Sequence, residues 1–168
     1  MQTIKNGLRH IVENWKPYVA FIALAEGVGA LAGFLTRAGV QYYEENVIKP
    51  DWTPPGSVFP VVWGILYALM GIGAARIWML PPSAERSRSL ILFGVQLAVN
   101  FFWSLLFFNL QAYGFAFVWL ILLWILIIWM MRSFWQIDHV AALLQVPYLL
   151  WVTFAAYLNG MVWLLNGM

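Results

Sequence analysis

The chain has no cysteine and only two histidines among its 168 residues. The lack of thiols excludes a disulfide framework, a thiolate metal site and a cysteine nucleophile. His10 and His139 both stand near the ends of apolar stretches, with no second ligand at metal spacing, so we expect neither a bound metal nor tight axial haem ligation. The sequence therefore predicts a protein without a metal and without a cofactor.

Charged residues are also scarce. Only 10% of the residues are charged and 63% are hydrophobic, whereas a soluble domain carries about 25% charged residues. The chain has no Ser-His-Asp set, no Gly-rich phosphate loop and no paired carboxylates. Because the net charge is only +2 and the basic residues are scattered, nucleic acid is not an expected partner. The composition is that of a protein embedded in the lipid bilayer.

Five apolar stretches are long enough to cross a bilayer, for which about 20 residues suffice. They are residues 17–36, 57–79, 89–108, 115–131 and 140–165. The fold class is therefore all-α, a polytopic membrane protein with a five-transmembrane-helix bundle. We expect a polar N-terminal segment, 1–16, and a single membrane domain, 17–166. Pro147 lies inside the fifth stretch and predicts a kink there.

Lys and Arg residues are distributed unevenly between the two sides of such a bundle. The N-terminal side and loops two and four carry Lys5, Arg9, Lys16, Arg76, Arg86, Arg88 and Arg132, whereas the side of loop one carries Arg37 and Lys49. By the positive-inside rule, the N-terminus is expected in the cytoplasm, with loop one and the C-terminus on the opposite side.

Residues 49–71 change from a proline-rich loop to an apolar helix within a few positions. Pro50, Pro54 and Pro55 predict a stiff, extended backbone, Ser57 a helix cap, and Pro60 the first helical turn. Loops longer than about 12–15 residues are often lids, so we predict that the first loop, 37–56, is a folded lid. An alternative is that its tryptophan and the one in the following helix anchor a helix end at the lipid surface.

Aromatic and amide side chains recur at helical spacing on three of the predicted spans. If these faces converge beneath the lid, they enclose a cavity suited to a flat hydrophobic ligand such as a macrocycle. The alternative is that they simply pack the core of the bundle. The residues are Trp63 and Tyr67 on the second span, Asn100, Trp103 and Phe107 on the third, and Tyr148, Trp151 and Asn159 on the fifth.

The first span carries a strip of small residues, Ala25, Gly29 and Gly33, at four-residue spacing. Such a strip lets another helix approach closely. It predicts either a homodimer seam or close packing within one bundle. Glu26 lies beside the strip in the middle of the span, where a charge is costly, so it is expected to be neutral, paired or directed into the bundle. Its role in ligand or proton handling is left open.

Three ordered motifs, spread over about residues 17–163, resemble the translocator protein family, also called tryptophan-rich sensory proteins or peripheral benzodiazepine receptors. The first joins Lys-Pro-Asp-Trp-Thr-Pro-Pro to Phe-Pro-Val-Val-Trp-Gly-Ile-Leu-Tyr-Ala-Leu-Met-Gly. The second is Gln-Leu-Ala-Val-Asn-Phe-Phe-Trp, and the third is Val-Pro-Tyr-Leu-Leu-Trp-Val-Thr-Phe-Ala-Ala-Tyr-Leu-Asn.

The resemblance implies a five-helix bundle, often a homodimer, that acts as a translocator or sensor. It also implies binding of porphyrins such as protoporphyrin IX and haem, of sterols, and of isoquinoline carboxamide or benzodiazepine ligands beneath the first loop. Trp52 and its neighbouring prolines match the lid. The matching pocket positions are Trp63, Asn100, Trp103, Phe107, Trp151, Ala155, Leu158 and Asn159.

The chain departs from the family pattern at two places. Phe115 stands where many relatives have Trp, and no basic residue follows Leu158 to complete the sterol-recognition segment of animal relatives. The resemblance leaves two functions open. One is binding and translocation or sensing, with porphyrin propionates near Lys49 or Arg37. The other is an enzyme that promotes light- and oxygen-dependent porphyrin degradation, with Trp63 and Trp151 as electron donors.

Overall fold

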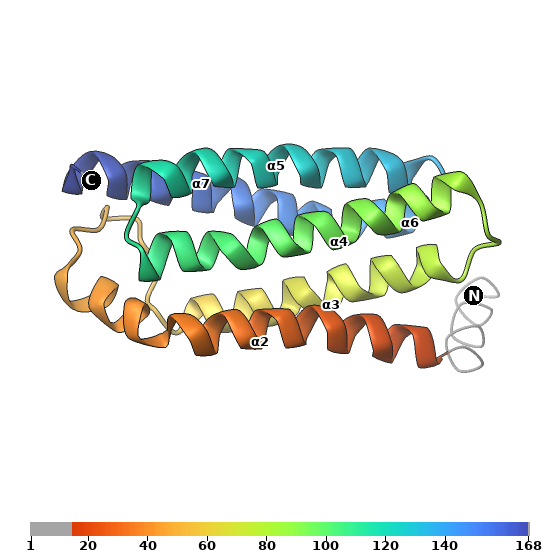
Figure 1. The fold of residues 1–168 in the computed structure, drawn as a ribbon, viewed down its shortest axis with the longest axis horizontal. Coiled ribbons are helices and arrows are strands. Elements are labelled where there is room, and N and C mark those ends of the chain that lie inside the picture. Colours follow the sequence, from red (N-terminus) through yellow and green to blue (C-terminus); the bar gives the residue numbers. More distant parts are fainter. Residues whose placement is uncertain (1–14, 168) are drawn as a thin grey trace.

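The computed structural model describes residues 15–167, which form five membrane-length helical segments running alternately up and down one bundle (Figure 1). No strand occurs in that range, and the predicted all-α membrane fold is confirmed. The predicted polar segment 1–16 lies almost entirely outside the described residues. The elements are α2 (Trp15–Asn46), α3 (Val58–Trp78), α4 (Ala84–Ser104), η1 (Leu105–Asn109), α5 (Tyr113–Trp135), α6 (His139–Leu143) and α7 (Val146–Asn166).

The helices form a closed ring. α2 packs against α3 on one side and against α4 and η1 on the other, while α5 packs against both α4 and α7. α3 completes the ring by contacting α6 and, to a smaller extent, α7. Figure 1 shows the loop between α2 and α3 at the same end of the bundle as the end of α7. We call this the loop end and the opposite one, where α6 lies, the α6 end.

α2 is longer than predicted. It continues ten residues beyond the expected end at residue 36, so the first loop spans 47–57 and not 37–56. The polar residues of 37–46 end the apolar span but not the helix, because no proline interrupts the backbone. Side chains also support the added turns, since Gln41 Nε2 donates to Glu45 Oε1 (2.9 Å) and Asn46 Nδ2 to the Tyr42 carbonyl (3.1 Å).

The start of α3 differs from the prediction in one detail. Ser57 precedes α3, but its backbone is already helical (φ −65°, ψ −20°) and its side chain makes no capping hydrogen bond. The expected cap is therefore absent. The Pro55 carbonyl instead accepts a hydrogen bond from the Val58 N–H (2.9 Å), which is a turn formed by the backbone alone.

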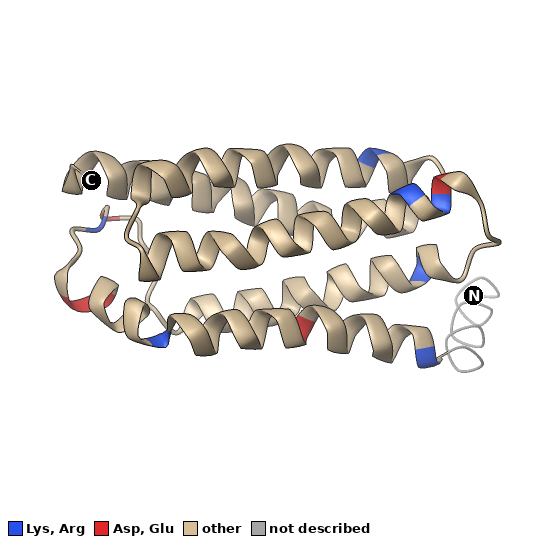
Figure 2. Cartoon of the chain, in the orientation of Figure 1, with Lys and Arg blue, Asp and Glu red and all other residues tan. Residues whose placement is uncertain are grey.

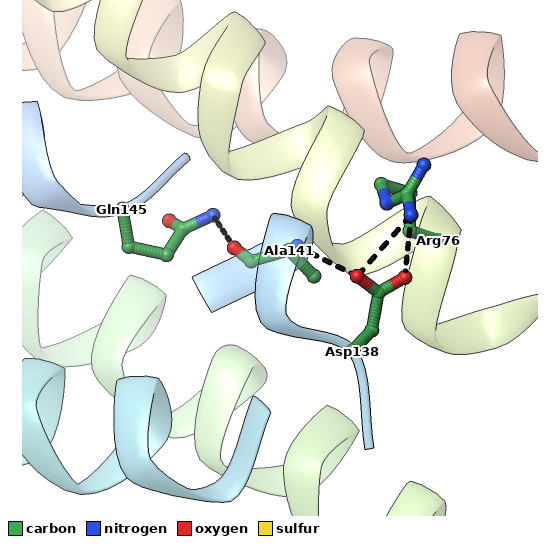
Figure 3. Close-up of polar contacts among 4 residues, drawn as sticks. All are labelled: Arg76, Asp138, Ala141 and Gln145. Carbon is green, nitrogen blue, oxygen red and sulfur yellow. Dashed lines mark hydrogen bonds and ion pairs between the residues drawn. The ribbon is translucent and has the colours of Figure 1, made fainter. Parts of the chain in front are cut away.

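The kink predicted at Pro147 is a complete break in the helix. α6 ends at Leu143 and α7 begins at Val146, with Pro147 in its first turn, where the missing N–H is tolerated. Figure 3 shows how the break is held: Asp138 pairs with Arg76 of α3 (2.8 Å), and the Gln145 amide donates to the Ala141 carbonyl (3.2 Å). The broken segment is thereby fixed against α3.

The third span ends in a wider turn. In η1 the backbone widens to a π-helical turn, so that the Leu110 N–H reaches the Leu105 carbonyl (3.1 Å). Gln111 then takes a positive φ of 53°, and α5 begins two residues later. This short connection makes the third and fourth spans antiparallel neighbours, as predicted. A π-helical turn inside an α-helix is frequently found at a functional site.

Candidate functional site

A cavity of about 900 Å³ lies at the loop end, between α2, α3, the end of α4, η1 and α7 and beneath the loop 47–57. Its size is that of a site for a drug-sized or somewhat larger ligand. Most of the predicted pocket residues line it. They are Trp63, Tyr67, Trp103, Phe107, Trp151, Ala155, Leu158 and Asn159.

The aromatic rings of the wall pack against one another in a fixed arrangement. Trp63 and Tyr67 lie one helical turn apart on α3 with ring centroids 5.4 Å apart, and Trp103 stacks on Phe107 at 5.3 Å. Trp151 of α7 meets the edge of Phe59 at 5.7 Å. Aromatic pairs at these distances are each worth about 0.5–1.5 kcal/mol beyond the area that they bury, so these contacts stabilise the arrangement of the wall.

The side-chain amide of Asn159 joins helices around the cavity through two hydrogen bonds. Trp103 Nε1 donates to Asn159 Oδ1 (3.2 Å), and Asn159 Nδ2 donates to the Tyr113 carbonyl (2.8 Å). Asn159 is 1% exposed, and both sides of its amide are satisfied. It therefore fixes the position of the Trp103 indole on the wall and ties α7 to the start of α5.

Two predicted site residues lie behind the wall. Asn100 does not line the cavity, but its Nδ2 donates to the Tyr67 hydroxyl (3.1 Å). Tyr148 is fully buried, donates to Gln96 Oε1 (2.9 Å) and packs against Trp63 with ring centroids 6.2 Å apart. Both residues position a cavity aromatic and do not face the cavity.

Trp52 is placed away from the cavity. Its side chain is 77% exposed, although its neighbours Pro50, Thr53, Pro54 and Pro55 do line the cavity. The loop thus covers the cavity with its backbone and prolines, and the indole points outward. Asn166 at the end of α7 holds this loop by pairing with both backbone groups of Ile48, at 3.1 Å to the N–H and 3.0 Å to the carbonyl.

The small residues of α2 belong to the inside of the bundle. Ala25 is fully buried, and a Cβ at Gly29 would meet the Tyr67 ring of α3. Gly33 has open space beside it and lines the cavity. Two predictions were made for this strip, a homodimer seam and close packing within one bundle. Close packing describes Ala25 and Gly29, because the space beside them is filled by the chain's own helices.

Sequence reasoning missed most of the contribution of α2 and of the loop. The cavity face of α2 has residues at three- and four-residue steps: Glu26, Gly29, Gly33, Thr36, Val40 and Tyr43. That spacing was visible in the sequence. It was missed because the glycines were interpreted as a packing strip and residues 37–56 as a loop, whereas small side chains on one helix also leave room for a cavity.

Charged groups reach the cavity at both ends. Glu44 and Lys49 lie near the loop, where Lys49 Nζ donates to the Glu44 carbonyl (2.8 Å) and lies 5.3 Å from the centre of the Tyr43 ring. Glu26 lies at the other end. Within 15–167 no cluster of His, Asp and Glu could hold a metal ion.

Known proteins match the chain over most of its length. The sequence model of the TspO/MBR family matches residues 21–164. The tryptophan-rich protein TspO of Chlorobaculum tepidum is 38% identical over 86% of this chain and 92% of its own. The translocator protein of Sus scrofa is 36% identical over 89% of each chain. The tryptophan-rich sensory protein of Cereibacter sphaeroides is 35% identical over 87% and 89%. The chain therefore belongs to the TspO/MBR family and is an integral, multi-pass membrane protein.

Proposed function

We propose that this protein binds a flat hydrophobic ligand, a porphyrin such as protoporphyrin IX or haem in the first place, in the cavity beneath the loop 47–57, and that it acts as a translocator or sensor of that ligand. The observation that carries the proposal is the convergence of Trp63, Trp103 and Trp151, from three different spans, on a single cavity of about 900 Å³. Indole faces bind fused rings by stacking.

The charges near the loop favour an anionic edge on the ligand. Lys49 lies at the cavity and donates only to a backbone carbonyl, so its ammonium keeps hydrogens for a ligand carboxylate. Porphyrin propionates would lie there, with the ring between the indoles. Synthetic isoquinoline carboxamide or benzodiazepine ligands and sterols would use the same apolar walls.

The loop 47–57 serves as the lid. It covers the cavity with three prolines and is held to α7 through Asn166, so release of this contact would open the cavity. The charge distribution favours a cytoplasmic N-terminus, with the lid and the C-terminus on the opposite side. Assembly as a homodimer would use a surface other than Ala25 and Gly29, which face the inside of the chain.

Titration with protoporphyrin IX tests the proposal. The purified full chain in lipid nanodiscs should show saturable quenching of tryptophan fluorescence, because several indoles would contact the ring. A Trp103→Leu variant removes one ring and the hydrogen bond to Asn159, and it should bind about tenfold more weakly, which corresponds to about 1.4 kcal/mol. Trp129→Leu, at an exposed position on α5, is the control. Absence of saturable binding, or equal affinity of the two variants, would contradict the proposal.

The second candidate is porphyrin degradation driven by light and oxygen. It is favoured by the placement of Trp63 and Trp151 at the cavity wall, where both indoles would lie near a bound ring. Trp151→Phe should keep most of the binding and abolish the light-driven loss of the porphyrin absorption band. Equal bleaching by the variant would remove this function from Trp151.

A further inference from the structure

Glu26 is an acidic residue in the middle of a membrane-spanning helix and lines the cavity. Figure 2 shows that the other charges gather toward the two ends of the bundle, whereas one acidic position lies midway along α2. From Tyr43, near the loop, to Glu26 the distance along the helix axis is about 25 Å. Glu26 therefore marks the deep end of the cavity.

No group among residues 15–167 neutralises Glu26. Its carboxyl takes part in none of the ion pairs or side-chain hydrogen bonds of those residues, and the ion pair found there joins Arg76 to Asp138 at the α6 end. The cations nearest along the chain are Lys16 and Arg37, ten and eleven residues away, and neither pairs with Glu26 within residues 15–167. Arg37 instead lies over the Phe34 ring (4.8 Å).

Glu26 is set beside the aromatic wall of the cavity. Gly29, one helical turn further along α2, lies against the Tyr67 ring, and Tyr67 accepts a hydrogen bond from Asn100 (3.1 Å). Residues three apart lie on the same face of a helix. The deep end thus combines a carboxyl with a tyrosine ring and is otherwise apolar. An unpaired carboxylate in such surroundings is costly, and a bound cation offsets that cost.

From this arrangement we infer that the deep end of the cavity is a subsite for a protonated nitrogen, held by Glu26, so that the protein prefers ring ligands that carry a basic amine or a protonated ring nitrogen. The inference rests on the proposed function, because it assumes that ring ligands enter this cavity. It adds a specificity that the rest of the wall does not provide. The aromatic walls accept any flat apolar ring, whereas the carboxylate distinguishes a cationic ring from a neutral one of the same shape.

Two probes of nearly equal shape test the subsite: acridine, which is neutral at neutral pH, and 9-aminoacridine (aminoacridine below), which is cationic. Binding of each to the full chain in nanodiscs of zwitterionic lipid is measured by calorimetry, and competition with protoporphyrin IX places the probes in the same cavity. The wild-type protein should bind aminoacridine more tightly than acridine. Glu26→Gln keeps the size of the side chain and removes its charge, and it should weaken aminoacridine binding about tenfold or more, the loss expected for one charge-assisted hydrogen bond, while acridine binding stays unchanged.

Matched variants separate this specificity from general effects. Glu45→Gln removes the same charge from the same helix at a position outside the cavity, where Glu45 accepts from Gln41, and it should leave both probes unaffected. Glu26→Asp keeps the negative charge and should retain the preference for the cation. This result would show that the loss in Glu26→Gln comes from the missing charge and not from misfolding. If Glu26→Gln weakens both probes equally, or weakens neither, or if the wild-type protein does not prefer aminoacridine, the inference is overturned. Protoporphyrin binding that persists in those cases would leave the proposed function intact.

Discussion

The two ends of the bundle are built differently although the same helices run through both. At the loop end, α2, α3, η1 and α7 stand apart around a cavity lined by aromatic rings. At the α6 end the core is filled: Ile77, Ile127 and Phe134 are fully buried, and Ser89 and Ser133 share a hydrogen bond of 2.7 Å. The hollow found there is a smaller groove of about 250 Å³, lined by α5, α6 and the start of α7. α3 contributes Trp63 to the first end and Ile77 to the second.

This difference indicates how an apolar membrane chain keeps a cavity open. Inside a bilayer the lipid tails are as apolar as the helix surfaces, so the hydrophobic effect does not drive the helices together. Their association depends on close packing and on polar contacts. Here polar contacts join the helices at both ends: Arg76 pairs with Asp138 at the α6 end, and Asn159 joins Trp103 to the Tyr113 carbonyl at the cavity. The two ends therefore differ in how closely their side chains pack and not in whether polar contacts hold them.

Two glycines of α3 provide the sharpest contrast between the ends. A Cβ at Gly71 would meet the backbone of Ile22 on α2, which cannot move aside, whereas a Cβ at Gly64, on the cavity wall, would meet nothing within 4 Å. Gly71→Ala should lower the free energy of unfolding by about 1–3 kcal/mol through overpacking. Gly64→Ala should leave it unchanged or slightly raised.

Denaturation of both glycine variants in detergent, followed by circular dichroism, provides the measurement. The comparison between the two ends predicts that Gly71→Ala unfolds at a lower denaturant concentration than Gly64→Ala. Equal midpoints for the two variants would mean that α2 and α3 are not held in close contact at Gly71, and the distinction between a packed and a hollow end would fail.

Asp138 tests the polar contacts that hold the α6 end. Its carboxylate pairs with Arg76 (2.8 Å) and also caps α6 by accepting the Ala141 N–H (3.0 Å). Asp138→Ala should lower stability by about 1–2 kcal/mol, most of it from the lost cap, because the Arg76 side chain is 33% exposed and such a pair contributes little. Asp138→Asn retains a capping oxygen and should lose much less. A loss in Asp138→Asn as large as that in Asp138→Ala would assign the stability to the ion pair instead.

The sequence was sufficient to predict the number of spans and their order. Those features depend on long apolar stretches, which can be recognised from local sequence alone. Helical spacing of the indoles left two alternatives open, a cavity wall or the core of the bundle. A kink at Pro147 was also predicted, because a proline inside a helix removes a backbone donor wherever it occurs, but the separation into α6 and α7 was not. Each of these conclusions follows from residues that are neighbours along the chain.

What could not be predicted depends on contacts between distant residues. The outward position of Trp52 follows from the attachment of the loop to Asn166, more than a hundred residues further along the chain. The placement of Asn100 and Tyr148 behind the wall depends on their partners Tyr67 and Gln96, which belong to other helices. Helical spacing assigns a residue to a face of its helix, but it does not tell whether that face meets a cavity or another side chain.

Ala155 tests whether the hollow end is where the ligand binds. It is 9% exposed and lines the cavity on α7. Ala155→Leu should fill part of that space and weaken protoporphyrin IX binding about tenfold, equivalent to about 1.4 kcal/mol, with little change in stability. Ala38→Leu makes the same substitution at an exposed position of α2 outside the cavity, and it should bind normally. If both variants bind like the wild type, α7 does not form a wall of the site.

The smallest expected effect concerns the lid of the hollow end. Asn166 holds the loop through two hydrogen bonds to Ile48, each worth about 0.5–1.5 kcal/mol. Asn166→Ala should therefore increase the rate at which protoporphyrin IX dissociates, by about three- to tenfold, while the stability of the packed end stays the same. Asn166→Asp keeps the oxygen that accepts from the Ile48 N–H but loses the donor, so its dissociation rate should lie between those of the wild type and Asn166→Ala. Stopped-flow displacement of protoporphyrin IX measures these rates, and identical rates in all three proteins would show that the loop does not control exchange with the cavity.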